Sequence, residues 1–267
     1  MSRHTPVMTV MVAAVRKAAR GLQRDFGEVE NLQVSLKGPG DFVSAADKKA
    51  EKILFDELSK ARPGYGFLME EGGAVEGADK SHRWIIDPLD GTTNFLHGIP
   101  HFAISVGLER DGQMVAGVVY NPITDEMYIA EKGQGAFLND RRLRVAVRRE
   151  LTQGVVGCGT PHIGRPGHEK YLAELRGVML NVSGVRRMGA ASLDLAYVAA
   201  GRFDAFWEAN LSPWDMAAGI VLVREAGGTV SDIDGRDDML KSGGILVGNE
   251  MMHAQLSKVL KQARQAN

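Results

Sequence analysis

The most constraining feature of the sequence is segment 84–95, WIIDPLDGTTNF, in which an apolar run ends in two aspartates and a glycine-threonine turn. The apolar run predicts a buried strand, and Pro88 denies that strand a further ladder donor. Gly91 permits a tight turn whose free backbone N–H groups can face an anion. The carboxylates of Asp87 and Asp90 then emerge at the same edge, where they suit a hard cation such as Mg²⁺. The segment can therefore hold a metal and a phosphate together.

A turn that merely carries solvated aspartates is the alternative, because Asp, Pro and Gly are ordinary turn residues. Two further acidic clusters weigh against it. Glu70 and Glu71 follow a short apolar strand and precede two glycines, although such clusters also mark plain loops. Asp215 falls in the first turn of a predicted helix, where an acid can simply favour the helix dipole. The three clusters form one carboxylate site if the ends of their elements converge.

Four elements of the chain resemble the inositol monophosphatase family, in the family's order and at similar separations. They are residues 41–47 (DFVSAAD), the pair Glu70 and Glu71, residues 87–95 (DPLDGTTNF) and residues 214–219 (WDMAAG). The resemblance covers nearly the whole chain. It departs at the flanks, where Met69 and Gly72 replace the Gly and Ser that often bracket the acid pair, and where the loop from Lys37 to Asp41 is a residue shorter.

The resemblance implies an α+β fold, a layered α/β/α/β/α sandwich of the sugar-phosphatase type. Sequence pattern alone indicates only mixed α and β structure. We expect one catalytic domain over residues 1–267, with an N-terminal α+β half (about 1–147) and a C-terminal α/β half (about 148–267). A likeness to this family also implies a homodimer.

The resemblance further implies a Mg²⁺-dependent phosphomonoester hydrolase with a defined ligand set. Glu70, Asp87 and the carbonyl of Leu89 would hold one Mg²⁺. Asp87, Asp90 and Asp215 would hold a second, so that Asp87 bridges the two ions. A third, weaker cation would rest near Glu70 through waters. Phosphate esters hydrolyse slowly unless such charges neutralise the phosphate oxygens and align a water.

The catalytic residues implied by the resemblance are Glu70, Thr92 and Asp47. The attacking water would lie against Glu70 and the Thr92 hydroxyl, whose proton passes toward Asp47. From the local sequence alone, Asp47 is a cap, because Ser44 three positions earlier resembles the start of a capping box. The amides of Gly91 and Thr92 would take phosphate oxygens.

Substrate contacts implied by the resemblance come from Asp90, Gly91 and Thr92 and from two further segments. The loop 187–192 would present Gly189 and Ala191 to the sugar ring, and Glu208 would accept hydrogen bonds from its hydroxyl groups. Read by itself, Glu208 is a surface acid at a strand end. The segment 159–168 is rich in loop-forming residues and is a candidate lid; its two histidines are interpreted as loop residues.

The substrate indicated is inositol 1-phosphate, which would yield myo-inositol and phosphate, and the resemblance also implies inhibition by lithium. The same scaffold serves fructose 1,6-bisphosphate, histidinol phosphate and 3'-phosphoadenosine nucleotides, so the metal motifs leave the alcohol open. A non-enzymatic alternative is a partner of a larger cellular assembly with incidental catalysis, since one fold can host unrelated functions.

Composition narrows the classes of partner. The 32 basic and 33 acidic residues give a formal charge of −1, so no basic stripe indicates nucleic acid. The single cysteine, Cys158, excludes an internal disulfide and is interpreted as a small buried residue at a strand end rather than a catalytic thiol. No signal-like start or membrane-spanning run is visible, which leaves the cytoplasm as the expected location, without a membrane partner.

Apolar periodicity predicts the helices and strands. Residues 7–22 recur at helical spacing, with Gly27 near the stop, and the cap at Ser44 begins a second helix. Short β-rich runs between 102 and 147 predict an antiparallel meander. The second half alternates strands near 155–156, 185, 203–207 and 245–247 with helices at 168–179, at 191–199, from Asp215 onward and at the end. Asp194, inside one of these helices, faces the core or a subunit partner and is assigned no function.

Overall fold

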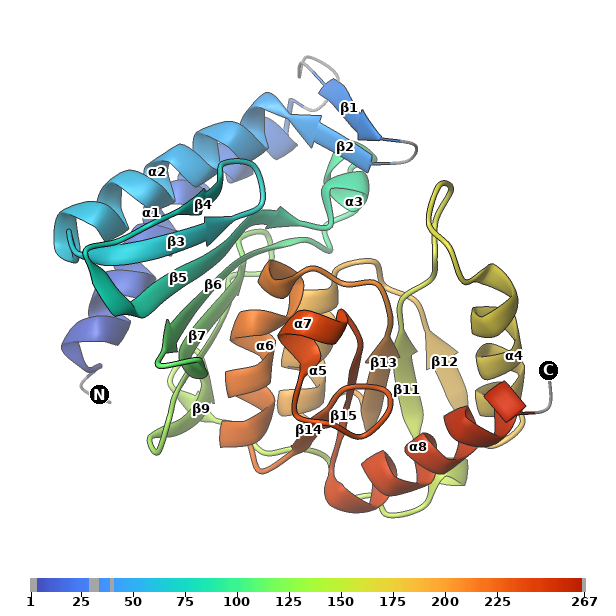
Figure 1. Ribbon diagram of the computed structural model, residues 1–267. Helices are drawn as coiled ribbons and strands as arrows, with labels where there is room; N and C mark the ends of the chain where they lie inside the picture. Colours follow the sequence, from blue (N-terminus) through green and yellow to red (C-terminus); the bar gives the residue numbers. More distant parts are fainter. Residues whose placement is uncertain (1–3, 29–33, 39–40, 266–267) are drawn as a thin grey trace.

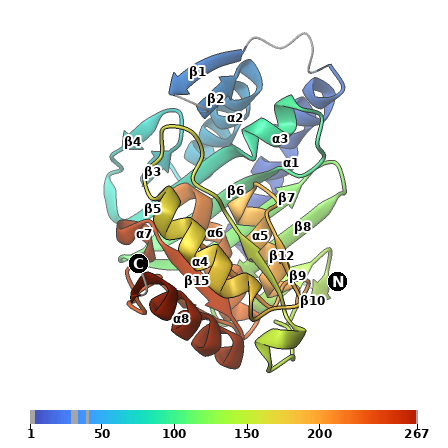
Figure 2. The same ribbon diagram turned by 90° about the vertical axis from the view of Figure 1, so that its right-hand side faces the viewer.

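Two β-sheets separated and covered by helices organise the chain (Figures 1 and 2). The computed structural model describes residues 4–28, 34–38 and 41–265. The larger sheet has eight strands in the order β10-β9-β8-β7-β6-β5-β3-β4, and the smaller has five in the order β12-β11-β13-β15-β14. A separate hairpin pairs β1 (Val34–Gly38) with β2 (Asp41–Ser44).

The eight-stranded sheet is built from β3 (Tyr65–Met69), β4 (Gly73–Val75), β5 (Asp79–Asp90), β6 (Ala103–Arg110), β7 (Gln113–Asn121), β8 (Glu126–Glu131), β9 (Gly135–Leu138) and β10 (Arg141–Arg142). The five-stranded sheet is built from β11 (Val155–Cys158), β12 (Gly184–Arg186), β13 (Ala205–Glu208), β14 (Thr229–Ser231) and β15 (Ile245–Gly248). The helices are α1 (Pro6–Phe26), α2 (Ala45–Ala61), α3 (Thr92–Leu96), α4 (His168–Met179), α5 (Ala191–Ala199), α6 (Pro213–Glu225), α7 (Met239–Ser242) and α8 (Glu250–Gln265).

Three apolar cores join five layers. Helices α1 and α2 pack on one face of the large sheet, α5 and α6 lie between the two sheets, and α4 and α8 cover the outer face of the small sheet (Figure 1). Each core contains residues from a sheet and from its covering helices. The α/β/α/β/α sandwich that the family resemblance implies is therefore confirmed.

Helices α1 and α2 begin where their caps stand in the sequence. Thr5 accepts a hydrogen bond from the Met8 N–H at 3.2 Å, Pro6 fills the first helical position, and Gly27 ends the helix. The helix at 7–22 is thus confirmed and is slightly longer than its apolar pattern. Ser44 and Asp47 form the capping box that starts α2. No helix in the described ranges is long and apolar enough to cross a membrane.

The antiparallel meander is confirmed from β6 to β10, but it ends at Arg142 rather than near 147. In the second half, the strand expected at 203–207 begins only at Ala205. Two short elements, β14 and α7, were not predicted. Both are too short to leave a clear apolar period in the sequence.

Helix α6 lies unusually close to the large sheet because two strand residues are glycines. A Cβ at Gly107 would lie 2.8 Å from Ala217 Cβ, and one at Gly117 would lie 2.6 Å from the Ala218 carbonyl oxygen. Real Cβ atoms rarely tolerate such contacts, so only glycine permits this approach. The approach matters for the site because α6 carries Asp215 in its first turn.

Candidate active site

Three of the predicted acids converge at one point. Asp87 and Asp90 stand at the end of β5, and Asp215 stands in the first turn of α6. Each offers a carboxylate oxygen, and these oxygens all lie within 4.8 Å of one another. Asp87 and Asp90 are buried. These three residues therefore converge, as a single carboxylate site requires.

The end of β5 is shaped by its own sequence. Its pairing with β6 is irregular between Asp87 and Asp90, where Pro88 interrupts the ladder. The Leu89 N–H donates to Asp87 Oδ1 at 2.9 Å, which fixes that carboxylate against its own turn. Gly91 follows at a φ of 91°, a left-handed conformation that suits glycine, and α3 starts at the next residue. The predicted turn and helix start are both confirmed.

Glu70 reaches the same edge through strand pairing. β3 runs parallel to β5 with Met69 opposite Ile86, and the Glu70 N–H donates to the Ile86 carbonyl at 3.2 Å. Glu70, the residue after Met69, therefore lies beside Asp87, the residue after Ile86. Burial, followed by repulsion from Glu70, Asp90 and Asp215, raises the pKa of Asp87 well above its usual range.

Asp47 makes both contacts that the sequence offered as alternatives. Its Oδ2 accepts hydrogen bonds from the Ser44 N–H at 2.9 Å and the Ser44 hydroxyl at 2.5 Å, which completes the cap. Its Oδ1 lies 3.2 Å from Thr92 Oγ1, and that hydroxyl is also 3.0 Å from the Leu89 carbonyl oxygen. Burial raises the pKa of Asp47 although the Ser44 hydrogen bonds oppose the shift. The cap and the contact with Thr92 thus coexist.

Asp90 and Asp215 are each fixed by a hydrogen-bonding serine. Ser192, at the start of α5, donates its N–H and its hydroxyl to Asp90 Oδ2 at 2.7 and 2.5 Å. The Ser212 N–H donates to Asp215 Oδ2 at 2.7 Å within a capping box. Sequence reasoning missed the Ser192 contact, because no local pattern links positions so far apart.

Glu208 is half-buried at the end of β13 and lines a cavity next to Gly159. A Cβ on Gly159 would lie 1.8 Å from Glu208 Cδ, so the carboxyl group occupies space that only glycine leaves open. Burial, then repulsion from Asp215 and Asp90, raises the pKa of Glu208 to about 8, while Arg187 and Arg165 oppose the shift. Glu208 is thus partly enclosed at the end of β13, not fully exposed as a surface acid would be.

The loop with Gly189 and Ala191 packs directly on the turn at Gly91. A Cβ on Gly91 would lie 3.3 Å from the Gly189 carbonyl oxygen and 3.2 Å from Ala190 Cβ. Gly189 itself has a φ of 88°. The structure therefore brings together the two segments to which the sequence assigned phosphate and sugar contacts.

The segment 159–168 borders a cavity of about 230 Å³ that Glu208 also lines. Arg165 Nη1 donates to the Asn210 carbonyl oxygen at 2.6 Å, which ties this segment to the residues that follow Glu208. The candidate lid thus lies beside Glu208. Its two histidines line neither this cavity nor the acid cluster among the described residues.

Several residues left open by the sequence are now placed. Cys158 is buried 3.4 Å from the Tyr171 hydroxyl, and burial raises the pKa of its thiol to about 11, which disfavours a nucleophile. Asp194 faces the core, not a surface, with its Oδ1 4.0 Å from His101 Nε2. The Glu71 N–H donates to Glu51 Oε2 at 2.8 Å. The Lys37 side chain and part of the loop up to Asp41 lie outside the described residues.

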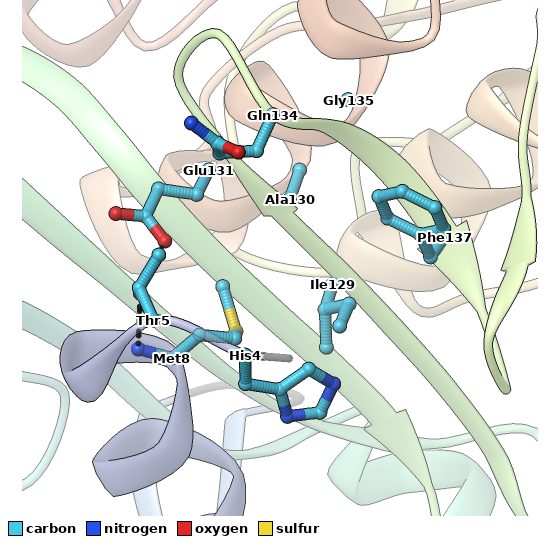
Figure 3. A pocket seen from close by; sticks show the side chains of 9 residues that line it. All are labelled: His4, Thr5, Met8, Ile129, Ala130, Glu131, Gln134, Gly135 and Phe137. Atoms are coloured by element: carbon cyan, nitrogen blue, oxygen red, sulfur yellow. Dashed lines mark hydrogen bonds between the residues drawn. The ribbon is translucent and has the colours of Figure 1, made fainter. Parts of the chain in front are cut away.

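A second concavity, of about 70 Å³, lies between the start of α1 and the β8–β9 hairpin (Figure 3). Thr5 Oγ1 donates to Glu131 Oε2 at 2.5 Å at its edge. None of the predicted metal, catalytic or substrate residues lines this pocket. It is therefore separate from the acid cluster.

The acid cluster suits a hard divalent cation. Its donors are carboxylate oxygens, which Mg²⁺ prefers, and burial of like charges at this spacing is costly without a compensating cation. The site contains no thiolate or imidazole donor among the described residues that would favour a softer metal.

Known proteins resemble this chain over almost its full length. A sequence model described as the inositol monophosphatase family matches residues 3–265. The inositol-1-monophosphatase of Mesorhizobium japonicum is 67% identical over 256 residues, which cover 96% of each chain. The Nus factor SuhB of Escherichia coli K12 is 40% identical over 265 residues, covering 96% of this chain and 99% of that protein. The crystal structure of the extragenic suppressor protein suhB of Bartonella henselae superimposes with a TM-score of 0.95 at 62% identity, covering 97% of this chain and 99% of that one.

We expect the metal-free protein to become less stable as pH rises from about 5 to about 9. The pKa is raised to about 6 for Asp90 and to about 8 for Asp215 and Glu208. An acid whose pKa is higher in the folded chain stabilises it fully below the unfolded pKa, near 4, and this contribution is lost as pH rises through the folded value. Melting temperatures in a chelator test this. In Glu208→Gln, the melting temperature should fall less between about pH 7 and 9 than in the wild type. A wild-type melting temperature that stays constant or rises with pH would contradict the expectation.

Proposed function

The chain belongs to the inositol monophosphatase family and is a phosphatase, and from this we propose that it hydrolyses inositol 1-phosphate to myo-inositol and phosphate with Mg²⁺ as cofactor. The observation that carries the proposal is the meeting of Asp87, Asp90 and Asp215 beside the turn at Gly91 and Thr92, called the phosphate turn below. Glu208 is close enough for Asp215 and Asp90 to raise its pKa. The name of the Mesorhizobium japonicum relative supports the choice of alcohol.

The ligands of the proposed cations come from the residue after β3, from the end of β5 and from the first turn of α6. Glu70, Asp87 and the Leu89 carbonyl would hold one Mg²⁺, and Asp87, Asp90 and Asp215 a second. When bound, the cations would neutralise phosphate charge and make water a better nucleophile. The hydrogen bonds that already fix Asp87, Asp90 and Asp215 support this role, because oriented ligands need little rearrangement.

The proton path runs through Thr92 and Asp47. Thr92 Oγ1 lies 3.2 Å from Asp47 Oδ1, within reach for a hydroxyl proton to be shared with that carboxylate. Glu70, which follows the neighbouring strand β3, would orient the attacking water. The N–H groups of Gly91 and Thr92 would donate to phosphate oxygens at the turn before α3.

The alcohol would bind between the loop 187–191 and Glu208. Gly189 and Ala191 supply backbone polar groups, and the Glu208 carboxylate can accept hydrogen bonds from ring hydroxyls. The raised pKa of Glu208 reflects the same partly enclosed setting.

Two alternatives remain in the proposal. Fructose 1,6-bisphosphate, histidinol phosphate or a 3'-phosphoadenosine nucleotide would use the same acids with a different alcohol. The name Nus factor, given to the Escherichia coli relative, keeps open a role in a larger assembly with incidental catalysis. An assembly role would survive loss of the metal ligands.

We also propose that both halves of the chain form one catalytic domain, which acts as a homodimer.

We expect Asp87→Asn to abolish nearly all hydrolysis while the fold is kept. The amide lacks the negative charge that a bridging cation ligand must supply. Loss of this interaction should cost several kcal/mol in the transition state, so less than about a tenth of the wild-type rate should remain. Phosphate release and circular dichroism measure the two effects. Asp204→Asn is the control, because this buried aspartate pairs with Arg148 outside the site and should lose stability rather than activity.

Glu208→Gln should separate recognition of the alcohol from phosphate chemistry. Cations bound by the acid cluster would offset the repulsion from Asp215 and Asp90 that raises the pKa of Glu208, so the side chain would be a carboxylate in the loaded enzyme. We expect KM for inositol 1-phosphate to rise about tenfold in this variant, because a neutral amide accepts hydroxyl hydrogen bonds less strongly than a carboxylate, while p-nitrophenyl phosphate is little affected. Steady-state kinetics on both esters provide the test. Glu225→Gln is a matched control, since Glu225 accepts N–H groups of Gly133 and Gly135 away from the site. Equal losses on both esters would assign Glu208 a structural role instead.

Lithium should inhibit hydrolysis in a mixed or uncompetitive manner. Li⁺ is small and hard enough for carboxylate oxygens, yet it carries half the charge of Mg²⁺ and can retain bound phosphate without supporting turnover. The measurement is a millimolar LiCl titration at fixed Mg²⁺, with KCl as the ionic-strength control. Purely competitive inhibition against the ester would contradict this explanation.

A further inference from the structure

We propose that Asn94 is a positioning residue that fixes the alcohol-binding loop 187–191 against the phosphate turn. The inference rests on the proposed function, which assigns that loop to the alcohol. Asn94 belongs to the same sequence segment as the metal-binding aspartates, but it has no role in the proposed chemistry. It acts through the loop and does not itself contact the substrate.

The side-chain amide of Asn94 joins three segments of the chain. Asn94 is buried in α3. Its Nδ2 donates to the His101 carbonyl at 2.8 Å and to the Met188 carbonyl at 2.9 Å, and it lies 3.5 Å from the Gly189 carbonyl oxygen. One amide therefore ties the helix after the phosphate turn to the segment before β6 and to the loop before α5.

The contact between turn and loop leaves no spare room. A Cβ on Gly91 would lie 3.1 Å from the His101 carbonyl oxygen and 3.3 Å from that of Gly189. A Cβ on Gly189 would lie 3.3 Å from Asn94 Nδ2. Both glycines have positive φ. The backbone of the loop thus contacts the amide of Asn94 directly, and the Arg187 side chain packs on Gly189 as well, with its Nη1 2.6 Å from that Cβ position.

The phosphate turn has its own supports, which predicts a selective effect. The Phe95 N–H donates to the Gly91 carbonyl at 3.0 Å, and Thr92 Oγ1 lies near Leu89 and Asp47. These bonds do not involve the Asn94 side chain. Loss of its amide should therefore release the loop, where the Met188 carbonyl loses its donor, while the turn and the acids keep their geometry.

A comparison of two asparagine variants on two esters tests the inference. Asn94→Ala should raise KM for inositol 1-phosphate about tenfold, because displacement of a substrate-positioning group weakens binding. Its kcat/KM for p-nitrophenyl phosphate, an ester without ring hydroxyls, should stay within about threefold of wild type. Asn249→Ala is the matched control. Its Nδ2 also donates to two carbonyl groups, those of Ala146 and Arg148, each at 2.8 Å, and it should change neither parameter.

Each outcome decides something distinct. Failure of the wild-type protein to hydrolyse either ester with Mg²⁺ would overturn the proposed function and this inference with it. An active wild type with equal losses on both esters in Asn94→Ala would overturn the positioning role alone. If Asn94→Ala does not fold, Asn94→Ser, which keeps a shorter donor, replaces it. A selective KM rise in that variant supports the inference, and unchanged kinetics on both esters refutes it.

Discussion

The rest of the site depends on the mutual repulsion of buried carboxylates. Asp87, Asp90 and Asp215 bring oxygens within 4.8 Å of one another. The pKa of each is raised, first by burial and then by repulsion that in all three residues includes Glu70. A chain that gathers such charges must hold each of them firmly, or they would turn apart toward solvent. A backbone N–H nearby in the sequence holds Asp87 and another holds Asp215. Asp90 is held by Ser192, which belongs to the other half of the chain. The protein itself therefore orients the acids, which would lower the reorganisation that binding of a cation requires.

Holding the acids in place requires the middle layer of helices. α6 carries Asp215 and packs against the large sheet at Gly107 and Gly117, so its distance from β5 is set by the absence of two side chains. α5 begins at the loop that meets the phosphate turn, and Ser192 in its first turn reaches Asp90. The apolar core shared by both sheets and these helices supplies the stability against which the charge cluster is held. A site between two halves of a chain is in this way as rigid as the packing between them.

Much of this could be predicted from the sequence, and the exceptions share a physical cause. The long helix α1, the capping box at Ser44 and the strand that ends at Asp87 and Asp90 depend on neighbouring residues, so local pattern was sufficient. The setting of Glu208 depends on how β13 lies relative to α6, which no local pattern encodes. The same holds for the contact of Ser192 with Asp90, which spans 102 positions. The short elements β14 and α7 were missed because so few residues leave no period.

The local and functional interpretations of an acid need not exclude each other. Asp47 caps α2 with Oδ2 and leaves Oδ1 beside Thr92, so the cap selects which oxygen faces the site. Asp215 is held at Oδ2 by the Ser212 N–H in the same type of box while it takes part in the acid cluster. In both residues the helix start orients a carboxylate that would otherwise rotate freely. The conformational entropy of that carboxylate is therefore lost once, when the chain folds, and not again each time a ligand binds. An acid three residues after a serine at a helix start is thus weak evidence for a site alone. It becomes informative when the other ends of apolar elements carry acids as well, because capping alone does not require their convergence.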